Sequence, residues 1–292
     1  DEEGYKIPGG GILTPKIAMV LPAAAGLVLK KTYGNYPAPI AIMNCIYEGL
    51  HLPIDRALAV ECRYFTQFVL SKESKNMIRT LFINMTEANK GMARPAGIPP
   101  TNLNKVGILG AGMMGAGIAY VAAVNGINIV LKDVTKEAAE KGKDYSVKLL
   151  SEKLSKNQIT KEKYDEILGR IFTTDNPKDM EGCNLVIEAV FESRELKATV
   201  TKESEAVLSK DAVFASNTST LPITGLAKAS ARPNNFIGLH FFSPVDKMQL
   251  VEIILGKKTS EYAIAMAIDF VTKIKKTPIV VNDGRGFFTS RV

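Results

Sequence analysis

Three glycines near the middle of the chain are spaced to cradle a phosphate group. They are Gly110, Gly112 and Gly115, and they follow the β-rich run Val106–Leu109 in a GxGxxG pattern. In this pattern the first glycine permits a tight turn, the second lets the backbone approach a pyrophosphate, and the third lets a helix pack closely on the strand. The helix that follows, up to Gly126, offers free N–H groups and its positive dipole end. A glycine-rich turn of another α/β protein is the alternative interpretation.

An acidic residue after the second apolar run indicates which dinucleotide would bind. Asp133 follows the run Ile127–Leu131 and lies 23 positions after Gly110. A carboxylate at about this offset accepts hydrogen bonds from the ribose hydroxyls of adenosine, and it repels a 2′-phosphate. The sequence therefore predicts NAD as the cofactor.

The chain holds two histidines, and His240 is the one placed to take a proton from a substrate. It follows the apolar run Phe236–Leu239, and the carboxyl ends of parallel strands are where α/β folds bind ligands. Glu252 lies among apolar residues of the run Met248–Leu255, where a carboxylate needs a partner. An imidazole oriented by that carboxylate would act as a general base on a substrate hydroxyl. The alternative is a structural histidine and a glutamate without mutual contact.

Two further groups of polar residues follow predicted buried strands. Ser216–Thr220 supplies hydroxyls and an amide that are able to orient a hydroxyl, a carbonyl or a nicotinamide amide. An ST-turn with a helix cap is the more common use of such residues. Glu188, Glu192 and Lys197 cluster on the rim where the cofactor is expected. A simple charge pattern at a helix start is the alternative for them.

Strands and helices must alternate from Asn104 onward to position these residues. We predict strands near 105–109, 128–132, 170–173, 184–189, 212–216, 236–241, 248–255 and 278–282, and helices near 113–124, 195–208 and 261–274. Such alternation favours a parallel sheet with helices on both faces. Between the second and third strands, residues 135–169 are predicted to form two helices with Thr135 and Thr160 as N-caps. The lysines of this pair indicate either a solvated face or a contact with a polyanionic ligand.

The first third of the chain has a different character. Residues 1–39 are rich in Gly and Pro, with a short helix expected over 17–31. Amphipathic helical patterns follow near 40–50, 54–70 and 72–89, the last one with Ser71 as N-cap and Gly91 as C′ residue. Arg94–Pro100 is predicted to be a linker. We identify no chemistry in these helices, and His51 is expected to be a surface or capping residue.

Composition excludes several classes of protein. With 46% hydrophobic residues the chain is able to build a real core. Its net charge of +7 suits acidic small molecules, but the lysines are mixed with acids and form no basic run interleaved with aromatics, so no nucleic acid is expected. The three cysteines lack metal-type spacing, which predicts reduced thiols and no metal site. We expect no membrane span and no signal peptide.

Several motifs together resemble those of the 3-hydroxyacyl-CoA dehydrogenases. They are Gly110–Gly115, Ser216–Thr220, His240–Val245, Leu250–Glu252 and Asn282–Phe287, in the family's order and close to its spacing. More narrowly, the chain is similar to the α-subunits of the multifunctional fatty-acid oxidation complex, in which an enoyl-CoA hydratase half precedes the dehydrogenase. The resemblance covers residues 103–292, and 36–100 more weakly resemble the helical tail and linker of the hydratase half.

The resemblance implies an α/β fold, a Rossmann-type doubly wound sheet with an inserted helical pair, preceded by a helical segment. It implies a helical tail and linker over 1–102, an NAD-binding Rossmann domain over 103–285, and the start of a C-terminal helical domain over 286–292. Since the chain starts at Asp1 and stops at Val292 inside a motif, we expect it to be a piece of a longer protein.

The resemblance also implies roles for individual residues. His240 is then the catalytic base, Glu252 its partner, and Ser219 a contact of both substrate and nicotinamide. The implied cofactor-binding residues are Gly110, Gly112, Met114, Gly115, Asp133, Val190, Glu192, Lys197, Ser219 and Ser243. Ser243 and Ser290 stand where many relatives carry Asn, the second being a substrate contact, and Arg285 stands in the usual Asp-Gly-Pro-Gly-Phe turn.

The implied function is NAD-dependent oxidation of (S)-3-hydroxyacyl-CoA to 3-oxoacyl-CoA in β-oxidation. The implied ligands and partners are an acyl-CoA substrate and, for the full-length protein, a thiolase β-subunit; the full parent chain would also be an enoyl-CoA hydratase. The expected location is the bacterial cytoplasm, with the mitochondrial matrix as the alternative. One competing reading is a truncated NAD-binding fragment without turnover, serving as a binding or structural module. Another is a dehydrogenase of free β-hydroxy acids, which would normally use a lysine base and an arginine, so His240 with Glu252 disfavours it.

Overall fold

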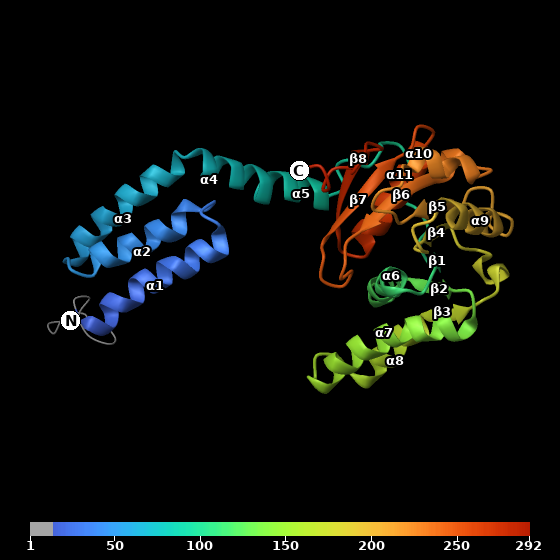
Figure 1. Cartoon of the computed structure of the whole chain (residues 1–292), viewed down its shortest axis with the longest axis horizontal. Helices are drawn as coiled ribbons and strands as arrows, with labels where there is room; N and C mark the ends of the chain where they lie inside the picture. Colours follow the sequence, from blue (N-terminus) through green and yellow to red (C-terminus); the bar gives the residue numbers. More distant parts are fainter. Residues whose placement is uncertain (1–13) are drawn as a thin grey trace. The chain divides into compact units, whose positions relative to one another are not determined.

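The computed structural model describes residues 14–292. They belong to two compact units, Asp1–Thr86 and Glu87–Val292 (Figure 1). The glycine-rich start of the chain, residues 1–13, lies outside the described residues. Each unit is considered by itself.

The first unit is helical. Its helices are α1 (Pro15–Thr32), α2 (Pro37–Gly49), α3 (Ile54–Val69), α4 (Lys72–Met77), the π-helical η1 (Ile78–Asn84) and α5 (Met85–Asn89), which crosses into the second unit. The helices predicted in this region are confirmed, and so is the N-cap of α4, because Ser71 Oγ accepts the Ser74 N–H at 3.1 Å. Gly91 follows α5 with φ +66°, as expected of a C′ glycine.

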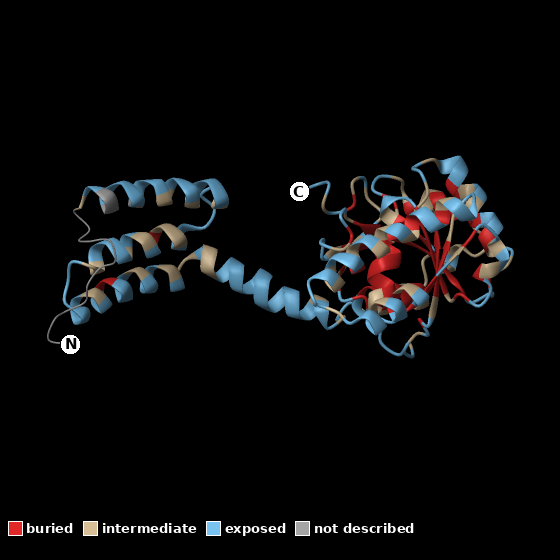
Figure 2. Cartoon of the chain, turned by 90° about the horizontal axis from the view of Figure 1, so that it is seen from below, coloured by how far each residue is buried: buried red, intermediate tan, exposed pale blue. Residues whose placement is uncertain are grey.

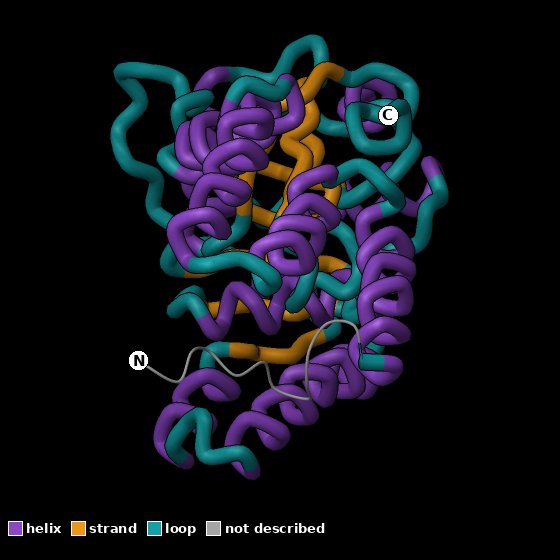
Figure 3. Tube along the Cα trace, turned by 90° about the vertical axis from the view of Figure 1, so that its left-hand side faces the viewer, coloured by secondary structure: helices purple, strands orange, loops and turns teal. Residues whose placement is uncertain are grey.

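The second unit is built on an eight-stranded sheet (Figure 3). Its strands are β1 (Lys105–Leu109), β2 (Asn128–Lys132), β3 (Ile171–Thr174), β4 (Leu185–Glu188), β5 (Val213–Ser216), β6 (Phe236–Phe241), β7 (Leu250–Leu255) and β8 (Thr277–Asn282). They lie in the order β3-β2-β1-β4-β5-β6-β7-β8. This is the doubly wound order of dinucleotide-binding sheets, extended by two strands.

The predicted parallel sheet needs one correction at its β7 edge. Strands β1 to β6 are parallel, but β7 runs antiparallel to β6, and β8 is parallel to β7. The prediction was wrong there because residues 242–249 are too few for a parallel crossover, which needs about a dozen residues or more. The antiparallel register sets His240 directly opposite Glu252.

Helices cover both faces of the sheet, as predicted. One apolar cluster joins the sheet to α6 (Met113–Val124), α7 (Lys136–Ser155), α8 (Lys161–Gly169) and α11 (Glu261–Lys273). A second cluster joins the other face to α10 (Ile223–Leu226), with α9 (Arg194–Glu205) packed beside it and short 3-10 turns at Pro177–Met180, Ala227–Ala229 and Pro233–Asn235. Neighbouring residues Ile108 and Leu109 enter different clusters, as the alternation of a strand requires.

The inserted helical pair is confirmed as α7 and α8. Thr135 Oγ1 accepts the Ala138 N–H at 3.2 Å, and Thr160 Oγ1 accepts the Lys163 N–H at 3.3 Å. Both threonines are therefore the N-caps that the sequence predicts.

The predicted linker Arg94–Pro100 packs on α11. The Arg94 guanidinium donates from Nε to Asp269 Oδ1 at 2.6 Å and from Nη2 to Asp269 Oδ2 at 3.0 Å, and it also binds the carbonyls of Ile98 and Pro99. Thr101 donates its N–H and its hydroxyl to the same carboxylate. Within the second unit, the segment is thus held to α11 by the ion pair between Arg94 and Asp269. Within the described residues, no helix is long and apolar enough to cross a membrane.

Candidate active site

The turn between β1 and α6 depends on two of the three predicted glycines. Gly110 has φ +89°, and a Cβ there would lie 2.8 Å from Ala189 O. A Cβ on Gly115 would lie 1.8 Å from Gly110 O, so α6 packs against the turn only with glycine at that position. Both residues therefore have the structural role that the motif assigns to them.

The middle glycine leaves space open. A Cβ on Gly112 would meet no atom within 4 Å, and Gly112 lines a pocket of about 300 Å³ at the carboxyl ends of the strands. Gly110, Asp133 and Val190 line the same pocket, together with the apolar side chains Val134, Phe191, Leu196 and Val200. Open backbone at the start of α6, a carboxylate and apolar walls fit the phosphate, ribose and adenine of a dinucleotide.

Asp133 is connected to the glycine turn itself. Its Oδ2 accepts the Ala111 N–H at 2.6 Å, and its Oδ1 accepts the Val134 N–H at 2.7 Å. These bonds orient the carboxylate beside the pocket. They also show that Asp133 stabilises the turn, a role that its offset in the sequence does not reveal.

His240 and Glu252 form the predicted pair. The His240 Nδ1 lies 2.7 Å from Glu252 Oε2, and Glu252 is fully buried. The His240 ring is also flanked by Phe242 and Phe287, with ring centroids 4.4 and 6.0 Å away. Since an ionised carboxylate only accepts hydrogen bonds, Nδ1 carries the proton and Nε2 is left as the base.

The sequence did not reveal two partners of Glu252. Its Oε1 accepts the N–H groups of Phe288 at 3.0 Å and Thr289 at 2.9 Å, and the Thr289 hydroxyl lies 3.2 Å from Oε2. Burial disfavours the charge of Glu252, but the Thr289 N–H and His240 outweigh it and hold its pKa below the ordinary value. Residues of the final turn thus keep the carboxylate ionised. No local signal marks backbone N–H groups for this use.

The polar loop after β5 is joined to Glu192. Glu192 Oε1 accepts a hydrogen bond from the Thr218 hydroxyl and one from the Ser219 N–H at 3.2 Å. Thr218 Oγ1 also accepts the Leu221 N–H at 2.9 Å, so the ST-turn interpretation holds for that residue. The Ser219 side chain is exposed, which leaves its hydroxyl accessible to a ligand.

Lys197 is buried and forms an ion pair with Glu188. Its Nζ lies 2.8 Å from Glu188 Oε1 and 3.3 Å from Glu192 Oε2, and Lys197 is 1% exposed. Burial raises the pKa of Glu188, and Lys197 opposes that rise. The charge cluster is therefore more than a helix-start pattern, because it joins the loops that follow β4 and β5.

Three further predicted site residues, Ser243, Met114 and Ser290, have separate surroundings in the structure. The Ser243 hydroxyl is 3.6 Å from the Met113 sulfur, which places it next to the start of α6. Met114 is half-buried against the core. Ser290 is exposed and donates its N–H to Gly286 O. No hydrogen bond within the described residues joins Ser290 to His240 or Ser219.

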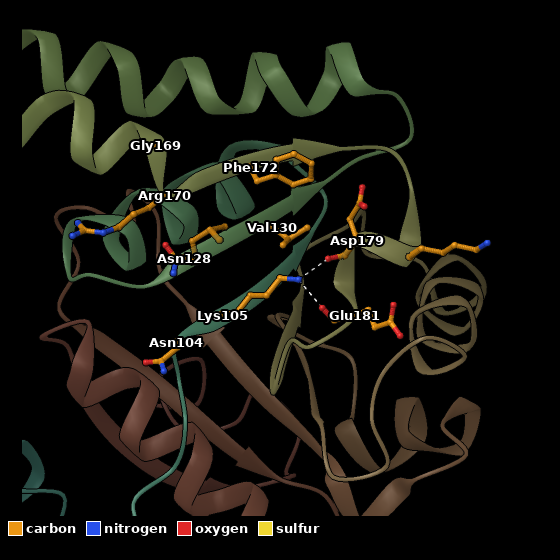
Figure 4. Close-up of a pocket in the computed structure, with 11 residues that line it drawn as sticks. Asn104, Lys105, Asn128, Val130, Gly169, Arg170, Phe172, Asp179 and Glu181 are labelled. Carbon is orange, nitrogen blue, oxygen red and sulfur yellow. Dashed lines mark hydrogen bonds between the residues drawn. The ribbon is translucent and has the colours of Figure 1, made fainter.

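A larger hollow, of about 580 Å³, lies at the opposite end of β1 and β2 (Figure 4). Its most central cation, Lys105, donates to Asp179 O at 3.0 Å and to Glu181 O at 2.6 Å (Figure 4). The Lys105 ammonium group is therefore occupied by backbone carbonyls. The hollow also lies at the amino ends of the strands, where α/β sheets do not usually bind ligands. We assign no chemistry to it. Among the described residues, no group of three or more His, Cys, Asp or Glu side chains is placed to hold a metal ion.

Comparison with known sequences gives a consistent result. The family profile described as "3-hydroxyacyl-CoA dehydrogenase, NAD binding domain" matches residues 105–284. A Shewanella protein named "Fatty acid oxidation complex subunit alpha" is 40% identical over 275 residues, which cover 94% of this chain and 38% of that protein. The protein of the same name from Shewanella oneidensis is also 40% identical, with 39% of its length covered. The chain therefore spans about two fifths of the length of these curated relatives.

Solved structures support the same assignment. The (S)-3-hydroxybutyryl-CoA dehydrogenase of Ralstonia eutropha is 36% identical, with a TM-score of 0.64 over 65% of this chain and 68% of that one. The 3-hydroxybutyryl-CoA dehydrogenase of Escherichia coli is 30% identical, with a TM-score of 0.62 over 64% of this chain and 39% of that one. By its glycine turn, its sheet order and these matches, the chain belongs to the NAD-binding domain family of the 3-hydroxyacyl-CoA dehydrogenases.

Proposed function

We propose that the chain carries out NAD-dependent oxidation of (S)-3-hydroxyacyl-CoA to 3-oxoacyl-CoA, as part of fatty-acid β-oxidation. The observation that carries the proposal is the contact of 2.7 Å between His240 and the buried Glu252, on the sheet that also holds the glycine turn. The names of the relatives support the substrate class.

The dyad supplies the base for this reaction. Glu252 holds the proton on Nδ1 of His240, so Nε2 accepts the proton of the substrate's 3-hydroxyl group. The Glu252 carboxylate then stabilises the imidazolium that forms. NAD⁺, when bound, supplies the acceptor for the hydride that leaves C3. The pKa of Glu252, which is held below its ordinary value, keeps this partner charged.

Other residues are proposed to hold the ligands. The cofactor residues in the pocket are Gly110, Gly112, Asp133 and Val190, and Met114, Gly115, Glu192, Lys197, Ser219 and Ser243 complete the proposed set. Ser219 is also proposed to touch the substrate, with Ser290 as a second substrate residue. Buried Lys197 would act mainly through the loops that it holds together.

The lysines of α7 are proposed to meet the polyanionic part of acyl-CoA only where they are exposed. Lys143 donates to Ile171 O at 2.8 Å, and Lys153 lies over the Tyr120 ring. Both ammonium groups therefore already have partners within the protein. Lys141 and Lys148 of α7, and Lys156 at its C-cap, are exposed and have no ion pair among the described residues. They remain available to phosphate groups.

The test is reduction of NAD by the chain with (S)-3-hydroxybutyryl-CoA, followed at the absorbance of NADH. We expect turnover that requires His240. Tight NADH binding without turnover would instead support the alternative of a binding module, and no binding of NADH would contradict the proposal as a whole. Free 3-hydroxybutyrate serves as the control substrate, because the dyad is proposed to act on the CoA ester.

For the full-length protein we further propose a thiolase β-subunit as partner, enoyl-CoA hydratase activity and a cytoplasmic location. The support is the name of the bacterial relatives, which describes a subunit of a fatty acid oxidation complex. We expect no hydration of crotonyl-CoA by residues 1–292 alone, since residues 1–102 contain no predicted catalytic pattern. Co-purification of the full-length protein with a thiolase would support the partner, and a monomeric full-length protein would contradict it.

A further inference from the structure

Glu188 is a fully buried acid that the proposed reaction does not use. It ends β4, and its exposed fraction is 0%. Its Oε1 accepts the Val190 N–H at 2.8 Å, and its Oε2 accepts the Ser216 hydroxyl at 2.8 Å. Lys197 Nζ lies 2.8 and 3.1 Å from the two oxygens. The carboxylate thus contacts the loop after β4, the end of β5 and helix α9 at once.

Lys197 extends this contact to the loop after β5. Its Nζ donates to Asn217 O at 3.2 Å and forms an ion pair with Glu192 Oε2 at 3.3 Å. Glu192 in turn binds the Ser219 N–H. The two loops that carry proposed cofactor residues are therefore joined through one buried ammonium group.

The hydrogen bonds around Glu188 and Lys197 also extend to strand β6, which carries His240, and to the glycine turn. Asn217 Oδ1 accepts the N–H of Phe241, the residue next to His240, at 3.0 Å. On the other side, Ala189 O lies so near Gly110 that only glycine fits there, and the adjacent Val190 N–H is held by Glu188. Hydrogen bonds thus connect Glu188 to both the cofactor pocket and the backbone beside His240.

We propose that Glu188 is a positioning residue that aligns the cofactor pocket with His240, acting through Lys197 and the loops at 189–192 and 216–220. The inference rests on the proposed function and names a residue that touches neither substrate nor cofactor. Without the Glu188 charge, Glu192 is the only carboxylate left to Lys197 among the residues that the structure describes. The ammonium would then draw Glu192 away from Thr218 and the Ser219 N–H, and the Val190 N–H would keep only an uncharged amide acceptor in place of the carboxylate.

The test uses Glu188→Gln, which keeps the shape and removes the charge, and Glu188→Asp, which keeps the charge and shortens the reach. Glu195→Gln, at an exposed position of the same helix, is the matched control. NADH binding is measured by fluorescence titration at a temperature where circular dichroism shows each variant folded. Hydrogen exchange is followed in peptides covering 189–193, 216–221 and, as reference, 128–132.

We expect Glu188→Gln to raise the Kd for NADH by about tenfold or more, because charge-assisted hydrogen bonds are lost. Exchange should become faster in both loops and stay unchanged over 128–132. Glu188→Asp should weaken binding less while leaving Lys197 paired, so it remains informative if the glutamine variant does not fold. A role in stability alone would lower the melting temperature with the Kd within about twofold of wild type, and that result would overturn the proposal.

Failure of the proposed function would be seen separately. Wild-type chain that binds NADH but does not turn over 3-hydroxybutyryl-CoA would remove the dehydrogenase assignment. The binding and exchange measurements on Glu188 would still decide whether the residue positions the loops.

Discussion

The two units differ sharply in how far their apolar residues are buried. In the described part of the first unit, the only buried apolar residues are Ala41 and Val60, and Phe65 and Phe82 are 68% and 70% exposed. In the second unit, many large apolar side chains are almost completely buried, and Phe214 is 2% exposed. Figure 2 shows the contrast, with the buried residues gathered around the sheet.

The difference shows that a helical apolar pattern does not by itself make a core. Helices α2 and α3 pack side by side, but a hollow of about 720 Å³ between them is lined largely by apolar residues such as Leu50 and Leu58. The sheet of the second unit has two apolar faces, and each is covered by helices. All predicted catalytic and cofactor residues lie in the unit that has this rigid support.

The two histidines give the largest expected contrast in activity. His240→Gln should lower turnover by about 10²–10⁴, the usual range for a lost general base, while His51→Gln should have no effect because His51 is exposed in the first unit. Steady-state and single-turnover oxidation of 3-hydroxybutyryl-CoA would measure both. Wild-type turnover in the His240 variant would remove this residue from the mechanism.

A pair of phenylalanines tests the difference in packing. Phe214→Ala should reduce the free energy of unfolding by about 3–5 kcal/mol, because a buried ring is replaced by a cavity. Phe65→Ala should change it by no more than about 0.5 kcal/mol, as is usual for surface positions. Denaturant unfolding of both variants gives the values. A large loss for Phe65→Ala would mean that the first unit has a core that the described contacts do not show.

Asp133 tests the cofactor pocket of the second unit. Asp133→Ala should weaken NADH binding by about 1.5–3 kcal/mol, the range for hydrogen bonds to a charged group, partly because the Ala111 N–H loses its acceptor. Fluorescence titration measures the change, with the exposed Asp144→Ala as control. Equal or tighter binding of NADPH than NADH by the unaltered chain would contradict the predicted preference.

An Arg94 variant tests whether the ion pair between Arg94 and Asp269 stabilises the second unit. Arg94→Ala should lower the free energy of unfolding by about 1–2 kcal/mol, because within the described residues the half-buried Asp269 then keeps only its bonds to Thr101. Exposed Arg63→Ala in α3 is the matched control and should change it little. Equal stabilities of the two variants would show that the ion pair with Asp269 is not needed.

Replacing Glu252 should have a smaller effect, on how stability depends on pH. Although burial disfavours its charge, its hydrogen bonds hold its pKa below the ordinary value. Its contribution to stability is therefore present above the unfolded pKa of about 4.3 and is lost as the pH falls through the lower folded value. Thermal melts at several acidic pH values should show a shallower decline for Glu252→Gln than for wild type.

The control for that experiment is Glu48→Gln in the first unit. Glu48 accepts the Tyr64 hydroxyl at 2.6 Å, but the pair is exposed, so its removal should leave the acid profile unchanged. An unchanged profile in Glu252→Gln as well would show that the charge of Glu252 does not contribute to stability.

Much of the second unit could be predicted because its signals are local. The helix caps Thr135 and Thr160 bind N–H groups three residues away. Gly126 has the positive φ of a C′ residue, and Gly110 has that of the tight turn. Each of these features depends on a few neighbouring residues, so the sequence pattern contains the needed information. The site residues named from the sequence remain proposals, although the structure brings His240 to Glu252 and Asp133 to the pocket.

The sequence by itself determined the order and type of the strands and of the longer helices, the glycine turn and the identity of the residues able to do chemistry. The tertiary structure alone decided that β7 runs antiparallel, so that His240 faces Glu252 across one pair of strands. It also decided that Phe288 and Thr289 bind Glu252, and that Glu188 and Lys197 form a buried pair between two loops. These contacts join segments far apart in the chain, and they form because a buried charge must find partners wherever the fold brings them.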